Sequence, residues 1–421
     1  MFISFKAGNT GPLKNKTGIT MACDIAKKEY LEDLTFEVNG NRYNKISYLF
    51  GANGAGKTNY LVALYKMQKA IITSTILGSN NSKLFEVPAI KSEFNTPIDT
   101  FRFDMDSHLI PTEFEIEMLI DNIIYIYNFK ILGGKILEEY LSKKNKRTEI
   151  LIKRTSPKYQ DIHLRSEMSS FKNNVNVVRE DSLCLAMAAM LNHELANIII
   201  DEIMNYKTIN MMALEGAPVF DDRNLDEETK SRYIKYLKIA DPTLVDFDVS
   251  FEEKADKHLI SEDFENKELI ITNIKVDIRS KHNIFKNHEV YKQEEVPFLQ
   301  FESSGTIRFF GILPSIFKAL DEGSVLFIDE IENGLHPNLM KLIINLFNSE
   351  ESNQKNAQLI CTSHDTLLLK NVRRDQVWFA EKNQYGETEI KRLSDFKNVR
   401  AKDKIFEKYL EGIFGAVPII D

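Results

Sequence analysis

The sequence lacks the cysteine patterns, long apolar runs and signal peptide that are typical of secreted, membrane-spanning or zinc-binding proteins. Its three cysteines, Cys23, Cys184 and Cys361, lie far apart and are odd in number, so they support neither a disulfide framework nor a zinc site. No run of eighteen apolar residues occurs, which argues against a spanning helix, and the first residues lack a signal-peptide pattern. We therefore expect free thiols, a cytoplasmic location and no membrane contact.

An excess of basic residues is also missing. The 421 residues include 54 Lys and Arg against 62 Asp and Glu, which gives a net charge of −8. This balance argues against wrapping of nucleic acid over a broad basic face, although a local basic stripe remains open. With 43% hydrophobic and 28% charged residues, the chain has an ordinary globular composition and is long enough for two or more lobes.

Turn residues and apolar spacing predict an α/β fold with a mixed sheet. The turns Asn39-Gly40 and Asp121-Asn122 predict hairpins between residues 36–38 and 43–50 and between 114–120 and 123–131. Helices are predicted from Gly56, within 182–206, and at 226–239, 306–320 and 337–347, and further strands at 247–251, 269–276, 325–328 and 358–362. The strand–helix alternation near the end indicates parallel strands covered on both faces.

Three segments follow from this pattern. Residues 1–146 form a lobe with a phosphate loop and antiparallel strands, residues 147–240 form a helical insertion or lid, and residues 241–421 complete the first lobe. The middle segment is set apart because a basic cluster is followed by a long apolar stretch without glycine or proline.

The most specific motif is a phosphate-binding loop. Residues Gly51 to Thr58 fit Gly-x-x-x-x-Gly-Lys-Ser/Thr between a predicted strand and a predicted helix. Backbone N–H groups of the loop and the helix N-terminus would hold phosphate, Lys57 would reach the β- and γ-phosphates, and Thr58 would bind Mg²⁺. The predicted nucleotide-binding residues are Asn53, Gly54, Ala55, Gly56, Lys57, Thr58 and Asn59. A chance glycine-rich turn is the alternative, and both flanks oppose it.

Two carboxylates end an apolar strand. Asp329 and Glu330 follow residues 325–328, which should deliver both acids to the edge of the sheet where ligands bind in α/β folds. Asp329 is the expected carboxylate on the Mg²⁺ side, and Glu330 is the expected catalytic base for water attack on the γ-phosphate. Solvated acids at a strand end are the alternative, which Lys57 upstream disfavours.

Two weaker features flank this acidic pair. Ser303, Ser304 and Gly305 precede a predicted helix and could form a second phosphate-binding end or a simple helix cap. His364 ends the strand at 358–362, where a neutral imidazole could contact the γ-phosphate or serve a structural role.

These four motifs occur in the order found in ATP-binding-cassette ATPases. The chain resembles the stand-alone cassette-like AAA ATPases of bacterial anti-phage operons, the group of the RloA, AbiLi and PtuA proteins. The resemblance is closest over residues 51–59, 303–366 and 373–418, and residues 329–337 resemble an extended acidic motif whose loop lines a dimer seam. It implies a P-loop NTPase fold of cassette type, with ATP and Mg²⁺ as ligands and slow ATP hydrolysis.

The resemblance also implies a mechanism. Two copies would form a head-to-tail homodimer, or a higher homo-oligomer, in which Ser303, Ser304 and Gly305 of one copy cap the γ-phosphate held by Lys57 of the other. Lys57, Glu330 and His364 would be the catalytic set. The switch would respond to a phage-derived trigger and control a separate, nuclease-like effector protein. The family's usual glutamine is missing, because none occurs between Gln68 and Gln160; a polar group near Asp104 to His108, or nothing, takes its place.

Other functions remain open at this stage. A DNA-repair ATPase of RecF type would bind DNA directly, and a scaffold would hold ATP with little hydrolysis. The basic cluster at residues 143–154 could touch nucleic acid or form a solvated face. The stretch after His364 is too short for the Toprim nuclease domain of related proteins. The spacing of Arg102 and His108 matches some ribonucleases, but a strand and turn is the better interpretation.

Overall fold

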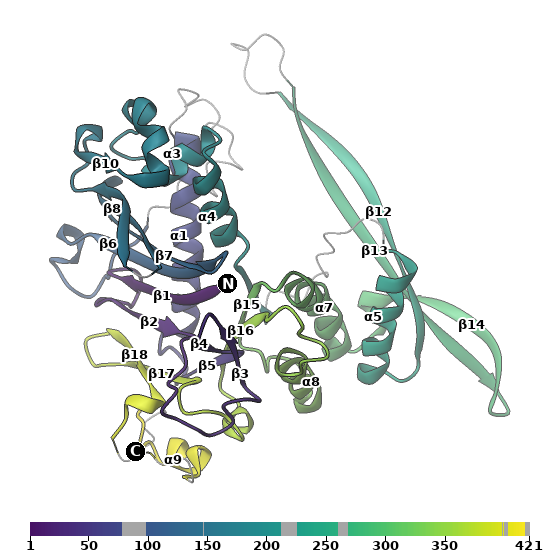
Figure 1. Ribbon diagram of the computed structural model, residues 1–421. Coiled ribbons are helices and arrows are strands. Elements are labelled where there is room, and N and C mark those ends of the chain that lie inside the picture. The colour runs from purple at the N-terminus through teal and green to yellow at the C-terminus, as the bar shows by residue number, and fades with distance from the viewer. Residues whose placement is uncertain are drawn as a thin grey trace. The chain divides into compact units, whose positions relative to one another are not determined.

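The computed structural model describes residues 1–77, 98–145, 147–211, 225–259, 268–397, 399 and 403–416. The chain forms two compact units (Figure 1). The first contains Met1–Ile209, Ala319–Glu330 and Leu346–Asp421, and the second contains Asn210–Lys318 and Ile331–Asn345. The units divide the chain differently from the three predicted segments, because residues 147–209 join the first unit. No helix of the described residues is long and apolar enough to cross a membrane.

A six-stranded sheet forms the base of the first unit. Its order is β11 (Lys207–Asn210), β15 (Val325–Asp329), β16 (Gln358–Ser363), β5 (Ile46–Phe50), β17 (Val377–Lys382) and β18 (Thr388–Arg392). β15, β16, β5 and β17 are parallel, and β18 is antiparallel to β17. Every residue of β5, β15 and β16 is buried, which confirms the predicted parallel strands covered on both faces.

A seven-stranded antiparallel sheet forms the second layer of this unit. Its order is β10 (Ile162–Leu164), β9 (Thr148–Arg154), β8 (Lys135–Lys144), β7 (Ile123–Leu132), β6 (Thr112–Ile120), β1 (Phe2–Gly8) and β2 (Thr17–Thr20). Asp121 and Asn122 have φ values of 47° and 66°, which confirms the predicted tight turn between β6 and β7. Strands β9 and β10 occupy the start of the segment that was predicted to be helical.

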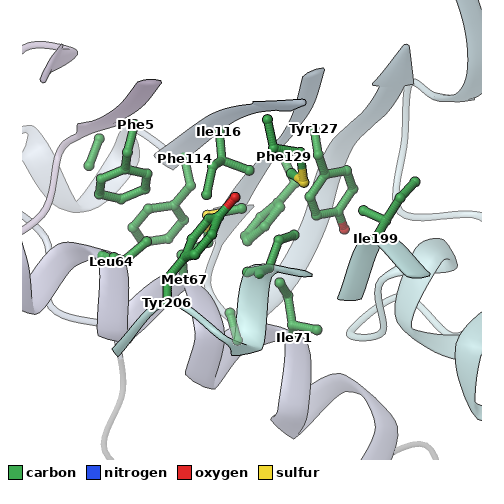
Figure 2. Close-up of a cluster of buried hydrophobic side chains, with 14 of the residues drawn as sticks. Phe5, Leu64, Met67, Ile71, Phe114, Ile116, Tyr127, Phe129, Ile199 and Tyr206 are labelled. Carbon is green, nitrogen blue, oxygen red and sulfur yellow. The ribbon is translucent and has the colours of Figure 1, made fainter. Parts of the chain in front are cut away.

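Helix α1 (Lys57–Leu77) packs against strand β1 of the antiparallel sheet and helix α3 (Cys184–Met190), and helix α4 (Glu194–Met204) packs against α3. Figure 2 shows Leu64 and Met67 of α1 facing Phe114 and Phe129 in one apolar cluster. Each fully buried side chain of this size contributes roughly 1.5–3 kcal/mol. Gln68 donates from Nε2 to the carbonyl oxygens of Ile203 (2.8 Å) and Tyr206 (2.9 Å), so it ties the end of α4 to α1.

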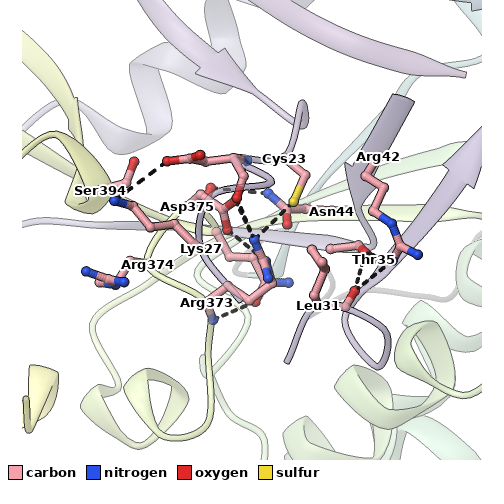
Figure 3. Close-up of polar contacts among 12 residues, drawn as sticks. Cys23, Lys27, Leu31, Thr35, Arg42, Asn44, Arg373, Arg374, Asp375 and Ser394 are labelled. Atoms are coloured by element: carbon pink, nitrogen blue, oxygen red, sulfur yellow. Dashed lines mark hydrogen bonds and ion pairs between the residues drawn. The ribbon is translucent and has the colours of Figure 1, made fainter. Parts of the chain in front are cut away.

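A buried polar cluster joins the N-terminal third to β17 (Figure 3). Arg373 and Asp375 are completely buried and paired at 2.8 Å. Arg373 also donates to the Cys23 sulfur at 3.0 Å, and Asp375 accepts from the Asp24 N–H. Burial raises the pKa of the Cys23 thiol to about 12, which favours the protonated thiol at neutral pH.

The predicted hairpin at Asn39-Gly40 is present but ends early. β3 (Thr35–Val38) pairs with β4 (Asn41–Asn44) through this turn, where both residues have positive φ. The chain then leaves the hairpin at Lys45, and β5 joins the other sheet. The single predicted strand over 43–50 is therefore two strands.

The second unit combines a three-stranded antiparallel sheet with helices. Its strands β12 (Leu244–Leu259), β13 (Glu268–Lys286) and β14 (Glu289–Pro297) follow α5 (Glu227–Ala240). Helices α6 (Phe298–Phe301), α7 (Ser304–Glu322) and α8 (Pro337–Asn348) complete it, the last two continuing into the first unit. Phe310 contacts the rings of Phe247 and Phe298 at 4.9 Å each and Tyr233 at 6.1 Å, which forms the core of this unit.

Short elements complete the described chain. They are the 3₁₀ turns Ser107–Leu109, Tyr159–Asp161, Ser166–Val177, Thr366–Leu369 and Leu393–Asp395, and helix α9 (Ile405–Leu410).

Candidate active site

The phosphate loop connects β5 to the N-terminus of α1, as the sequence predicted. Gly54 and Gly56 have φ values of 76° and 101°, a region in which L-residues are strained. A Cβ on Gly56 would lie 2.4 Å from the Thr388 hydroxyl, whereas a Cβ on Gly54 would meet nothing within 4 Å. Thr388 also donates to the Ala55 carbonyl oxygen at 2.8 Å. The loop is therefore backed by β18 on one side and open at Gly54.

Lys57 lies at the centre of the loop. Its side chain is 5% exposed and donates to the carbonyl oxygens of Gly51 (2.8 Å) and Ala52 (3.2 Å). His364 places Nε2 2.9 Å from the Lys57 ammonium nitrogen. The structure therefore brings together two predicted residues that are far apart in the sequence.

The remaining loop residues differ in exposure. Ala55 and Gly56 are buried, whereas Asn53, Gly54, Thr58 and Asn59 are exposed. Thr58 is the second residue of α1 and directly follows Lys57. Open backbone at Gly54 and an exposed helix N-terminus suit bound phosphate, because unpaired N–H groups and the helix dipole both favour an anion.

The acidic pair lies two strands from the phosphate loop in the same sheet. Asp329 is 2% exposed and accepts a hydrogen bond from the Thr362 hydroxyl at 2.7 Å. The same hydroxyl oxygen accepts from the Glu330 N–H at 2.8 Å. Glu330 has a φ of 52°, so its backbone is in the left-handed region and leaves the strand conformation of β15.

Strand order explains why these residues meet. β16 lies between β5 and β15, and all three are parallel. Their carboxyl ends therefore share one sheet edge, where Lys57 follows β5, Glu330 follows β15 and His364 follows β16. This edge carries an ammonium, two carboxylates and an imidazole, which is a suitable group set for phosphate and a divalent cation.

Two residues of this site were not predicted. Thr362 fixes the Asp329 carboxylate, and Thr388 fixes the back of the phosphate loop. In the pairing of β15 with β16, Ile328 lies opposite Cys361, so the next residues, Asp329 and Thr362, also lie opposite each other. This pairing is the signal that could have identified Thr362. That register becomes visible only when the strand order is known.

The predicted second phosphate-binding end, Ser303, Ser304 and Gly305, which we call the signature turn, lies in the second unit. Ser303 accepts a hydrogen bond from the Thr306 N–H at 3.1 Å and so caps α7, and both Ser303 and Ser304 are exposed. A Cβ on Gly305 would lie 3.1 Å from the Gly334 carbonyl oxygen. The turn thus packs closely against the loop that follows the acidic motif, within the same unit.

The segment from Asp104 to His108 is held at the turn between β1 and β2. Asp104 pairs with Lys14 at 2.8 Å, and the hydrogen bond from Lys14 lowers the Asp104 pKa. His108 places Nδ1 2.7 Å from the Met105 carbonyl oxygen. Asn9 donates its amide to the carbonyl oxygens of Ser107 and Ile110. These contacts tie the segment to that turn.

The sheet, the phosphate loop and the acidic strand end define an α/β P-loop NTPase fold. Over residues 46–183 and 193–370 the chain matches the family described as AAA domain, putative AbiEii toxin, Type IV TA system. This match covers more than half of the chain, and the protein belongs to that family.

Comparison with solved structures gives a distant likeness. The chain is similar to the SMC head domain from Thermotoga maritima, with a TM-score of 0.37 and 10% identity, covering 93% of this chain and 98% of that chain. No curated protein sequence matches the chain significantly.

Proposed function

We propose that this protein binds and hydrolyses ATP as a cassette-like switch. The observation that carries the proposal is the meeting of Lys57, Asp329, Glu330 and His364 at the carboxyl edge of three adjacent parallel strands. Membership of an AAA family supports the same activity. The arrangement supplies a phosphate cradle, a cation ligand and a base, which are the parts that phosphoryl transfer to water requires.

Each residue has a distinct role in this proposal. The loop from Asn53 to Asn59 holds the phosphates, with Lys57 contacting the β- and γ-phosphates. Thr58 and Asp329 would hold Mg²⁺, which neutralises phosphate charge when bound. Glu330 accepts a proton from the attacking water, and its backbone is held by Thr362.

His364 has a different task at the same edge. Its ring nitrogen contacts Lys57, so phosphate at Lys57 would lie within reach of the imidazole. We propose that His364 senses the γ-phosphate.

Dimerisation is the second part of the proposal. Ser303 and Ser304 are exposed at the start of a long helix, α7. A helix N-terminus with two hydroxyls can donate hydrogen bonds to phosphate oxygens. We propose that Ser303, Ser304 and Gly305 of one copy cap the γ-phosphate bound by Lys57 of another, so that ATP closes a head-to-tail homodimer or higher homo-oligomer and hydrolysis opens it.

The family description supports a proposal for the biological role. The name of the family mentions a putative AbiEii toxin and a type IV toxin–antitoxin system. This supports a role in anti-phage defence or abortive infection, close to the RloA, AbiLi and PtuA group. We propose that ATP-driven dimerisation controls a separate nuclease-like effector in response to a phage-derived trigger.

The test is ATP turnover by Glu330→Gln, which keeps the side-chain shape but removes the base. We expect kcat to fall about 10²- to 10⁴-fold, with nucleotide affinity retained and with ATP-dependent dimers that persist. Lys57→Ala should instead abolish nucleotide binding. If Glu330→Gln turned over ATP as fast as wild type, Glu330 would not be the catalytic base. If wild type held ATP tightly but did not hydrolyse it, a scaffold function would be favoured.

A further inference from the structure

We propose that Ser280, His282 and Glu302 form a positioning cluster that holds the signature turn in its ATP-competent geometry. The inference rests on the proposed function, because it assigns the residues that place Ser303 for contact with the nucleotide of a second copy. All residues of the cluster lie in the second unit.

Glu302 is the residue directly before Ser303. Its side chain is 2% exposed, and one carboxylate oxygen receives two hydrogen bonds from β13. Ser280 donates its hydroxyl at 2.5 Å, and His282 Nε2 lies at 2.8 Å. The two hydrogen bonds hold the buried carboxylate in one position. Moving it away would break these bonds and leave a buried charge without its partners, which is energetically costly.

The backbone of Glu302 is fixed as well. Its N–H donates to the Phe298 carbonyl oxygen at 3.0 Å and ends α6. Phe298 is completely buried against Phe310 at 4.9 Å. Side chain and main chain of Glu302 are therefore both anchored, although the next two residues, Ser303 and Ser304, are exposed.

His282 connects this anchor to α5. Its Nδ1 lies 3.2 Å from the Thr243 hydroxyl, which itself donates to Asp241 at 2.7 Å. Asp241 is the C-cap residue of α5. The chain of contacts thus runs from the end of α5 through β13 to the residue that precedes the signature turn.

The unit has other sources of stability besides this cluster. The core of the unit is the aromatic cluster around Phe310, and α7 is already capped by Ser303 itself. What the cluster adds is a fixed position for the main chain at Glu302. A displacement of about 1 Å at a phosphate-contacting group can cost about 10²-fold in rate. Loss of this fixed position could therefore lower the rate measurably.

The same strand offers a matched control. Lys281 lies between Ser280 and His282, so its side chain leaves the opposite face of β13. It makes its own ion pairs, with Asp248 at 2.6 Å and Glu295 at 3.3 Å. Lys281→Gln therefore removes charge from the same strand without touching Glu302.

The experiment compares His282→Gln, Ser280→Ala and Lys281→Gln in the full chain. We expect His282→Gln and Ser280→Ala to lower kcat for ATP about tenfold or more, with the affinity for nucleotide under non-dimerising conditions within about twofold of wild type. Lys281→Gln should match wild type in both quantities. Each variant is also combined with Glu330→Gln, and ATP-dependent dimer formation is measured by light scattering. The His282 and Ser280 double variants should dimerise more weakly than the Lys281 double variant.

The outcomes separate the two proposals. If wild type neither hydrolyses ATP nor dimerises with it, the proposed function fails. If wild type does both and the His282 and Ser280 variants behave like Lys281→Gln, the positioning cluster fails. A parallel loss of nucleotide affinity and of kcat would show a general folding defect, which also overturns the positioning role. A folded Glu302→Gln with wild-type kcat would overturn it as well.

Discussion

Thr362 is a small residue with two tasks in the candidate site. Its hydroxyl donates to Asp329 and accepts from the Glu330 N–H, so one side chain orients the proposed metal ligand and the proposed base. Because Thr362 is completely buried, no water can replace the hydroxyl without rearrangement.

Thr362→Val tests this arrangement. The variant leaves a buried carboxylate oxygen and an N–H without their partner, which should cost about 1–3 kcal/mol of unfolding free energy. We also expect a lower kcat for ATP. Thr362→Ser is the control, because it keeps the hydroxyl and should keep most of the turnover. Chemical denaturation and steady-state kinetics measure both effects, and wild-type kcat in Thr362→Val would contradict the assignment.

Lys14 is a second residue with several partners near the phosphate loop. It pairs with Asp104 at 2.8 Å and Glu387 at 2.7 Å. Glu387 directly precedes Thr388, which holds the loop. Hydrogen bonds from Lys14 lower the pKa of both carboxyl groups, so these pairs stabilise the fold when the carboxylates are ionised.

The pH dependence follows from that direction. A carboxyl group with a lowered pKa contributes stability above its unfolded pKa, and this contribution disappears as pH falls through the lowered pKa. Lys14→Met should therefore reduce the unfolding free energy at neutral pH and have no effect once both carboxyl groups are protonated. Urea unfolding of both proteins across this range measures the difference. A difference that persisted in acid would contradict the ion-pair explanation.

At the residue scale, the sequence predicts contiguous motifs best. Lys57, Asp329, Glu330 and His364 could be proposed as site residues because each belongs to a pattern or ends an apolar strand. Thr362 and Thr388 were missed because their partners are set by strand order and register. These depend on contacts between segments that are distant in the chain.

At the scale of elements, α3 is attached to the antiparallel sheet through a buried carboxylate. Glu139 of β8 accepts from the N–H groups of Cys184 (2.7 Å) and Leu185 (2.9 Å) and from the Tyr127 hydroxyl (3.0 Å). Arg154 lies 4.0 Å away, and both charged side chains are completely buried. The carboxylate satisfies the unpaired N–H groups at the start of the helix.

Glu139→Ala should therefore be strongly destabilising. It leaves the Arg154 charge and the first N–H groups of α3 uncompensated, at a cost of about 3–5 kcal/mol. The matched control is Glu138→Ala on the neighbouring residue, whose half-exposed pair with Lys130 contributes about 0–1 kcal/mol. Denaturant unfolding followed by circular dichroism measures both variants. Equal losses would show that the cap is not important for stability.

Elements with a clear pattern were predicted and polar ones were not. Helix α5 begins after Asp226 and ends at Ala240, close to the predicted range of 226–239, because its cap and the following proline are local signals. Strand β14 was missed, since its residues are almost all exposed and show no apolar alternation. Backbone pairing with β13 alone makes it a strand.

For the whole molecule, the proposed head-to-tail dimer predicts complementation between two inactive variants. Lys57→Ala destroys the phosphate site, and Ser303→Arg blocks the signature turn, so each homodimer is inactive. A mixed dimer contains one site with both defects and one site with neither. Mixing equal amounts should therefore restore about a quarter of wild-type turnover.

Steady-state ATPase assays of the two variants, alone and mixed, measure this effect. Mixing Lys57→Ala with Glu330→Gln is the control, since both substitutions affect the same half of the site. If the mixed Lys57 and Ser303 variants stay inactive while each still folds, the signature turn does not act on the nucleotide of another copy.

The sequence predicted the α/β fold class, but it did not predict how the chain divides into units. Residues 210–318 and 331–345 form one unit, so the acidic motif itself is split between Glu330 and Ile331. Compactness depends on contacts across the chain and leaves no local signal at that position.

The left-handed backbone of Glu330 has a consequence for laboratory evolution. Glutamate at a φ of 52° costs about 1 kcal/mol relative to glycine, which has no Cβ, and is also less favourable than asparagine, whose short side chain can hydrogen-bond locally. Selection for heat resistance alone should drift toward those two residues at position 330 and discard the proposed proton acceptor. Libraries of this protein therefore need a turnover screen beside any thermal challenge.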